Sequence, residues 1–135
     1  MAARTLVKAL FTGCILSSVA VSADAASIDG AWASPGDACD KVFVRSGKGI
    51  SFAPEADMYG SGFIIRGNQV QGKMANCKVN ARKRDGLSVQ VTAACSTSIA
   101  VESIQFMLKK AGENKITRMY PGLPELNTDY DRCNF

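Results

Sequence analysis

Two alternating runs joined by a turn, in residues 71–95, constrain the fold of this chain more than any other feature. Apolar side chains occupy every second position in residues 75–81 and again in residues 87–95. A period of two indicates half-buried β-strands, and Asp85-Gly86 between the runs is a strong hairpin signal. The sequence therefore predicts a central β-hairpin.

This hairpin has a cysteine near each outer end. The odd-numbered residues face inward on both strands. The residue numbers of two directly opposed positions must therefore add up to an even number, which excludes a two-residue loop around Asp85-Gly86. A three-residue loop at 85–87 would place Cys77 opposite Cys95, at a separation that a disulfide can span. A loop at 84–86 would make the two cysteines diagonal neighbours. We favour the first arrangement and expect a Cys77–Cys95 bond.

The N-terminal segment predicts export. Arg4 and Lys8 form a short positive region, residues 9–21 are mostly apolar, and small residues precede a cleavage point after Ala25. We therefore expect a signal peptide in residues 1–25 and a periplasmic or secreted protein of a Gram-negative bacterium.

Two other interpretations of this segment remain open. A membrane anchor would need roughly 20 apolar residues, more than this run supplies, so we expect no transmembrane segment after cleavage. Residues 11–14 are loosely similar to a bacterial lipoprotein box, which would place a lipid on Cys14.

The cysteines after the signal form an even set, Cys39, Cys77, Cys95 and Cys133. In an oxidising compartment an even set predicts two disulfides. A zinc site is disfavoured, because the chain has no histidine and no C-x-x-C motif. A domain of roughly a hundred residues buries a modest core, so two such bonds matter to its stability.

Other short segments with β character account for most of the remaining chain. A helix is conceivable for residues 101–110, which contain several helix-favouring side chains, but their alternation favours a strand. Three large apolar residues in a row at 63–65 suggest burial on both faces or a second layer. The sequence predicts an all-β protein, a small antiparallel meander of about eight strands that forms a barrel or a sandwich with two disulfides. Further strands are expected at residues 41–45, 49–53, 63–66, 69–71, 101–110, 115–120 and 128–133.

The expected domain opens with Gly30 and Trp32, a G-x-W motif that holds the only tryptophan in the sequence. This opening resembles that of lipocalin-like barrels and of small bacterial protease-inhibitor barrels, where a cysteine follows as Cys39 follows here. It is also similar to small exported alphaproteobacterial β proteins with paired cysteines. The resemblance implies that Trp32 plugs one barrel end and that a last-strand arginine, here Arg132, packs across it. Without any family, Trp32 is simply the largest core residue.

A barrel of this kind also bears on the second disulfide. The first and last strands meet in an antiparallel barrel, so Cys39 would pair with Cys133 and lock the two ends of the domain together. This pairing depends on the barrel and on the Cys77–Cys95 bond.

Four basic residues on the central hairpin are candidate binding residues. If the alternation holds, Lys78 and Arg82 project from its outer face and Lys83 and Arg84 from its tip. Such a cluster suits an anionic envelope polymer or an acidic protein surface. We favour a plainer interpretation, a solvated hairpin whose charges discourage edge-to-edge pairing. The small net charge of +4 and the lack of interleaved aromatic residues argue against nucleic acid.

Two loops are candidate recognition elements. Residues 54–62 carry Tyr59, a residue type favoured at interfaces, and residues 121–127 display Leu123 between two prolines. The plainer interpretations are a connection anchored by one aromatic ring, and a leucine that folds over a barrel mouth.

Catalytic chemistry has little support in this sequence. Without histidine, the ordinary serine and cysteine dyads and imidazole metal ligands are excluded. The available carboxylate pairs are Asp129 with Asp131 and Glu55 with Asp57. Nothing in the sequence indicates that either pair is suited to acid and base catalysis. We expect a protein that is not an enzyme and holds no cofactor.

The expected function is an exported binding module, such as an inhibitor of a protease or lysozyme, that meets an envelope or secreted partner through the two loops. The alternatives are a lipocalin-like carrier of a small ligand and a structural envelope protein. We rank the carrier second, because a barrel of this size leaves little room for a cavity.

Overall fold

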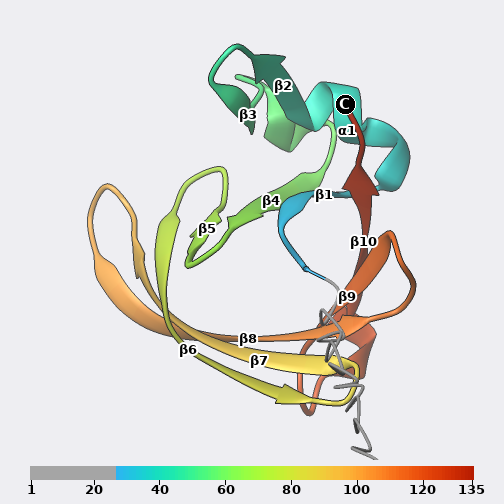
Figure 1. The fold of residues 1–135 in the computed structure, drawn as a ribbon. Coiled ribbons are helices and arrows are strands. Elements are labelled where there is room, and N and C mark those ends of the chain that lie inside the picture. The colour runs from blue at the N-terminus through green and yellow to red at the C-terminus, as the bar shows by residue number, and fades with distance from the viewer. Residues whose placement is uncertain (1–26) are drawn as a thin grey trace, which may run out of the picture.

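The computed structural model describes residues 27–135, and eight antiparallel strands of this part of the chain close into a barrel (Figure 1). The barrel strands are β1 (Gly30–Ser34), β4 (Ser61–Arg66), β5 (Gln69–Gln71), β6 (Asn76–Asp85), β7 (Ser88–Ser96), β8 (Val101–Lys110), β9 (Lys115–Met119) and β10 (Thr128–Cys133). From β4 to β10 each strand pairs with the next, and β1 closes the ring between β10 and β4. The predicted all-β meander is confirmed, as a barrel. The predicted signal peptide and the alternative lipid site at Cys14 lie outside the described residues.

A small second layer covers one wall of this barrel from outside. It consists of the 3₁₀ helix η1 (Gly36–Ala38), the helix α1 (Cys39–Val42) and a separate hairpin of β2 (Phe43–Ser46) and β3 (Gly49–Phe52). The strand predicted at 41–45 therefore begins only at Phe43. The reason is that Ala38 and Val42 lie one helical turn apart and are both buried in the apolar cluster between this layer and the barrel.

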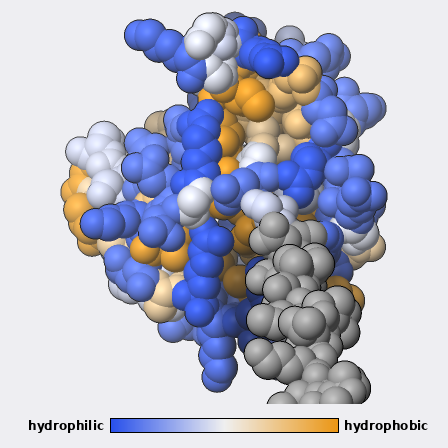
Figure 2. All heavy atoms as spheres, viewed as in Figure 1, coloured by the Kyte–Doolittle hydropathy of each residue, from blue (hydrophilic) through white to orange (hydrophobic). Residues whose placement is uncertain are grey.

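The barrel wall under this layer is apolar on both faces. Ala31, Ala33 and Ile64 belong to the outer cluster, whereas Trp32 and Ile65 belong to the inner one. This explains the apolar run at 63–65, as the sequence suggested. In Figure 2 hydrophobic surface is visible in the upper part of the molecule, between hydrophilic side chains.

The central hairpin differs from the predicted one at its turn. Asp85 pairs with Ser88, so the loop has two residues, Gly86 and Leu87, and the excluded loop length is the one observed. A β-bulge between Val79 and Ala81 shifts the register by one residue. Beyond the bulge, opposed residues no longer have numbers with an even sum, so the argument against a two-residue loop does not apply. Gly86 has a φ of +57°, which suits the first position of a two-residue hairpin loop.

Both predicted disulfides are present. Cys77 and Cys95 are directly paired across β6 and β7, below the bulge, so the predicted bond forms although the loop prediction behind it was wrong. Cys39 is bonded to Cys133, which ties α1 of the outer layer to the end of β10. The closing of the ring by β1 and β10 is also as expected for a barrel.

Candidate functional site

One end of the barrel is closed by a plug built around Trp32. This side chain is fully buried, and its indole N–H donates a hydrogen bond of 2.9 Å to the carbonyl of Ile28. The guanidinium of Arg132 lies 4.3 Å from the centre of the tryptophan ring. The same group donates hydrogen bonds to the carbonyls of Ser27 and Asp29. Trp32 and Arg132 therefore make the contact that the G-x-W resemblance implied, and we call this end the plugged end.

The barrel interior beyond the plug contains a cavity of about 330 Å³. Pockets that bind small molecules are typically about 300–1,000 Å³ and mainly apolar, with a few placed polar groups. The polar side chains at this cavity are Ser61, Arg118 and Tyr130. The apolar lining consists of Phe63, Ile65, Val70, Val91, Ile104, Phe106, Leu108 and the Cys77–Cys95 disulfide.

The cavity exists because one barrel strand is very short. β5 pairs only with the second half of β4, so residues 61–63 have no strand partner on that side. Residues 72–75 continue the chain there, and Gly72 and Ala75 from this loop line the cavity with little side-chain volume. The Lys73 ammonium donates hydrogen bonds of 2.7 Å and 2.6 Å to the carbonyls of Ala53 and Pro54 and so anchors the loop.

Arg118 brings a positive charge to the cavity. Its guanidinium lies 5.0 Å from the ring centre of Phe106 and 5.0 Å from that of Tyr120. Within residues 27–135 no carboxylate lies at ion-pair distance from the Arg118 guanidinium. The one ion pair in this part of the chain joins Lys115 to Asp131. The two rings stabilise the cation and leave its hydrogen-bond donors without a partner in this part of the chain.

Tyr130 supplies a second polar group from the neighbouring strand. It is 6% exposed, and its ring packs edge-on against Phe63 with a centroid distance of 4.8 Å. The hydroxyl of Ser61 lies 3.5 Å from the Tyr130 hydroxyl, a long hydrogen bond. The cavity thus combines an apolar body with one cation and two hydroxyl groups.

The sequence analysis did not single out Arg118, Tyr130 or Phe106. A signal for Arg118 was present, because Ile116 and Arg118 share one face of β9 at a period of two. Ile116 is buried in the inner core, so an arginine two positions later also faces the barrel interior.

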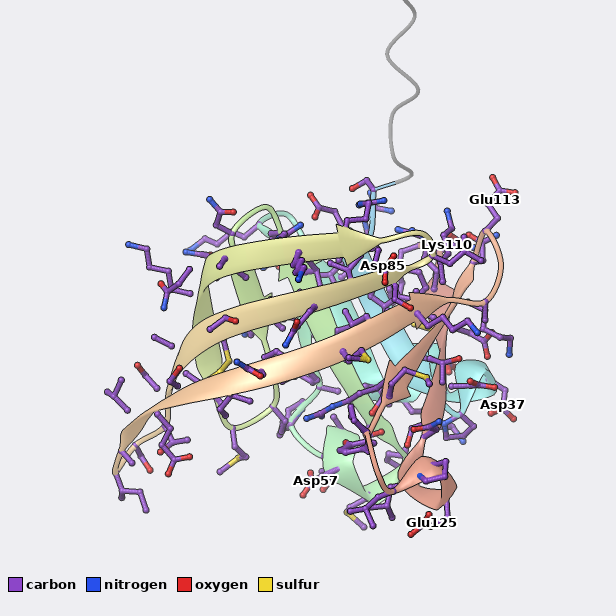
Figure 3. The ribbon with its side chains drawn as sticks, turned by 90° about the horizontal axis from the view of Figure 1, so that it is seen from below. Asp37, Asp57, Asp85, Lys110, Glu113 and Glu125 are labelled. Carbon is purple, nitrogen blue, oxygen red and sulfur yellow. A yellow bond between two sulfur atoms is a disulfide. The ribbon has the colours of Figure 1, made fainter. Side chains whose placement is uncertain are left out.

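The two predicted recognition loops lie at one end of the molecule. Figure 3 labels Asp57 from the first loop and Glu125 from the second, opposite the end that carries Asp85 and Glu113. We call this the loop end. Tyr59 is 47% exposed, with the Lys41 ammonium 5.2 Å from its ring centre, and Leu123 is 49% exposed. The second loop contains a short 3₁₀ helix, η3 (Pro124–Leu126), where no regular structure was expected.

The basic candidates do not form one patch. Lys78 pairs with Ala94 before the bulge and Lys83 with Gln90 after it, both on the outer face. Arg82 and Arg84 pair with the buried Val91 and Val89, so the bulge turns them towards the inner face, opposite to the prediction for Arg82. Arg82 donates a hydrogen bond to the carbonyl of Gly67 at the plugged end. The structure therefore divides this cluster between two faces of the hairpin.

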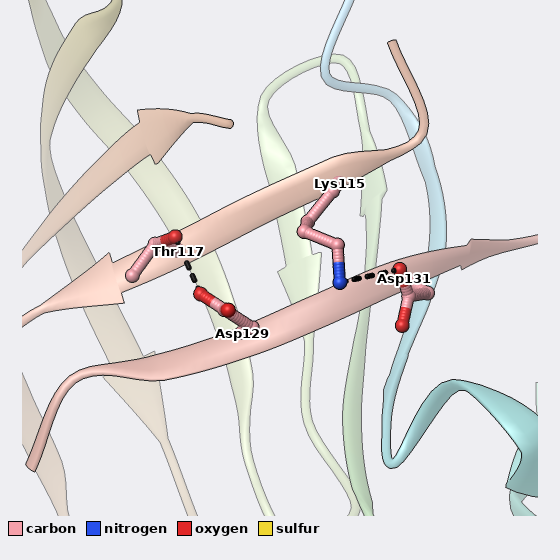
Figure 4. A network of polar contacts seen from close by, with 4 residues as sticks. All are labelled: Lys115, Thr117, Asp129 and Asp131. Carbon is pink, nitrogen blue, oxygen red and sulfur yellow. Dashed lines mark hydrogen bonds and ion pairs between the residues drawn. The ribbon is translucent and has the colours of Figure 1, made fainter. Parts of the chain in front are cut away.

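The carboxylate pair of β10 lies outside the barrel and already has polar partners (Figure 4). Asp129 accepts a hydrogen bond of 2.6 Å from the Thr117 hydroxyl, and Asp131 lies 3.1 Å from the Lys115 ammonium. Glu55 and Asp57 are exposed on the loop end. In residues 27–135 there is no cluster of histidine, cysteine, aspartate or glutamate side chains suited to a metal ion.

Comparison with known proteins identifies no relative. No protein-family model matches the chain, and neither the curated proteins nor the solved structures include a significant match. Among residues 27–135, no helix has the length and hydropathy needed to cross a membrane. The two disulfides suggest an oxidising, extracytoplasmic environment.

Proposed function

We propose that this protein binds a small, largely apolar molecule inside its barrel and acts as a carrier. The observation that supports this function is the cavity of about 330 Å³ beside the Cys77–Cys95 bond. Its volume lies within the usual range of ligand pockets, and apolar side chains dominate its lining. The sequence ranked a carrier second because a small barrel leaves little volume, but the short β5 strand leaves such a space.

Binding of an uncharged probe tests this function. We expect decan-1-ol to bind the oxidised protein at a single saturable site in isothermal titration calorimetry, because burial of its chain in the cavity is favourable. Ile104→Trp places a larger side chain at the cavity lining and should abolish binding. Val44→Trp adds the same side chain on β2, outside the barrel, and should leave binding unchanged. Equal binding by both variants would contradict the proposal.

The second candidate is inhibition of a hydrolase by the two loops. It is supported by exposed apolar side chains at the loop end, where Met58 is 74% and Leu126 is 51% exposed, next to Tyr59 and Leu123. Apolar side chains on loops held by a rigid scaffold are typical of binding surfaces.

A pull-down from envelope extract tests this candidate. We expect one protease or lysozyme to be enriched by the oxidised protein and lost with Leu123→Ser. The charge-reversed Lys83→Glu variant serves as the control, because Lys83 lies on the outer face of the hairpin. Capture that depends on Lys83 instead would favour an anionic envelope polymer or an acidic surface.

Either function would operate outside the cytoplasm. The disulfides and the predicted signal in residues 1–25 support the periplasm or the exterior of a Gram-negative cell as the compartment. N-terminal sequencing of the exported protein should find Ala26 as the first residue. A lipid-modified Cys14 would contradict this.

A further inference from the structure

The cavity contains a feature that an uncharged ligand would leave unused. We propose that the ligand is an amphipathic carboxylate of the fatty-acid type, whose anionic group binds Arg118. This inference rests on the proposed carrier function and specifies the ligand class for the same cavity.

The argument begins with the position of Arg118. β9 pairs with β8 and β10 so that Arg118 lies opposite Leu108 and Thr128, and its side chain lines the cavity. It is only partly exposed, and the rings of Phe106 and Tyr120 flank it. Partial burial beside an apolar cavity reduces the hydration of the guanidinium, but no buried polar side-chain atom of the described residues lacks a hydrogen-bond partner, so its donors stay accessible to an incoming anion.

The described part of the chain supplies no such anion. Glu102 is the inward-facing carboxylate of β8, since it pairs with Cys95, but it is exposed and makes no ion pair with Arg118. A ligand carboxylate would provide two oxygens for the planar fork of the guanidinium, a geometry that gives strong bidentate hydrogen bonds. The buried Tyr130 hydroxyl is a further donor in the lining of the same cavity.

The shape of the cavity limits the rest of the ligand. Away from β9, the cavity is lined by Val70, Val91 and the Cys77–Cys95 disulfide. These side chains carry no charge that could bind a second polar group of a ligand. A volume of about 330 Å³ lies at the lower end of the usual range for ligand pockets, which suits a short or medium-length unbranched chain. We therefore infer a medium-length apolar tail on a single carboxylate.

Three probes of equal chain length test the ligand class by titration calorimetry: decanoate, decan-1-ol and decylammonium. We expect decanoate to bind the oxidised protein at least about tenfold more tightly than decan-1-ol, because its carboxylate can form charge-assisted, bidentate hydrogen bonds with the guanidinium and the alcohol cannot. Decylammonium should bind most weakly. Arg118→Gln should lower decanoate affinity to that of decan-1-ol and leave decan-1-ol binding unchanged.

Two further variants distinguish the loss of the Arg118 guanidinium from a general effect of removing a positive charge. Arg118→Lys keeps the cation without the fork and should restore part of the preference for decanoate. Lys109→Gln removes one positive charge from an exposed position of β8 and should retain the full preference. Equal binding of decanoate and decan-1-ol, or a preference that survives in Arg118→Gln, would overturn the anionic ligand while the carrier function stands. Absence of binding by all three probes would overturn both.

Discussion

Two of the arginines on the inward face of this barrel, Arg132 and Arg118, have different surroundings. Arg132 at the plugged end lies over Trp32 and donates hydrogen bonds to two backbone carbonyls. Arg118 at the cavity lies between two aromatic rings and has no carboxylate partner within the described chain. The comparison shows what an arginine used for structure looks like in this fold. Arg118 shares the aromatic contact but has no hydrogen-bonded carbonyl in the described chain, which is why we assign it to the ligand.

The same contrast extends to the side chains around each arginine. At the plugged end Trp32 and Ile116 are almost completely buried and fill the interior. At the cavity, Phe106 and Ile104 are only partly buried, and residues 72–75 replace a strand in the wall. The account therefore predicts a stable plugged end and a cavity region that contributes less to stability and more to binding.

The largest expected effect is the loss of a disulfide, and the two bonds should differ. Cys39–Cys133 spans 94 residues and Cys77–Cys95 spans 18. Because the stabilisation grows with the size of the closed loop, replacing the first pair by serine should cost roughly 4.7 kcal/mol and replacing the second roughly 3.2 kcal/mol. Urea unfolding of the two double variants measures the order. A larger loss for the cavity pair would contradict the comparison.

The next effect is truncation of the plug. Trp32→Ala should lower the free energy of unfolding by about 4 kcal/mol, because it removes a completely buried aromatic side chain. Phe106→Ala, at the lining of an existing cavity, should cost less than half of that. Chemical denaturation at equilibrium measures both. Similar losses for the two variants would mean that the cavity end is packed as tightly as the plug.

Substitution of the two arginines sharpens the comparison directly. Arg132→Gln should cost about 1–3 kcal/mol of stability, because it removes the stacking on Trp32 and charged hydrogen bonds to backbone carbonyls. Arg118→Gln should cost less than about 1 kcal/mol, because it removes the contacts of a partly exposed cation with two aromatic rings but no hydrogen bond. Thermal unfolding of both variants without ligand is the measurement. A loss with Arg118→Gln as large as that with Arg132→Gln would show that Arg118 is structural.

The smallest expected effect concerns the loop beside the cavity. Lys73→Met should remove the hydrogen bonds to the carbonyls of Ala53 and Pro54 and loosen residues 72–75. Stability should fall by about 1 kcal/mol or less, while dissociation of bound decanoate becomes severalfold faster. Stopped-flow displacement measures the rate, with Lys48→Met on the exposed β2–β3 turn as the control. An unchanged rate would indicate that this loop does not limit ligand exchange.

Much of the fold could be predicted because it depends on local patterns. Alternation identified most of the barrel strands, and turn residues identified their connections. The Cys77–Cys95 bond followed from the same alternation near the base of the hairpin. The predicted turn was wrong because a bulge at Asn80 depends on barrel curvature, which a strict period of two does not include.

The candidate site could be predicted only in small part. The short strand at residues 69–71 was predicted correctly, but alternation alone does not show how far the neighbouring strands extend past it, so the cavity beside it was not foreseeable. The loops with Tyr59 and Leu123 were identified because turn residues and exposed apolar side chains are local features. Arg118 was missed because a charged residue on an inward face has meaning only once the interior is known to contain a space.

Methyl NMR during titration with decan-1-ol tests the central claim most directly. The account predicts saturable shifts of the methyl resonances of Val91, Ile104 and Leu108, which line the cavity. The methyls of Val44 and Ile50 in the outer hairpin should not respond. Absence of saturable shifts at the cavity methyls, or shifts confined to the outer hairpin, would contradict a ligand-binding barrel.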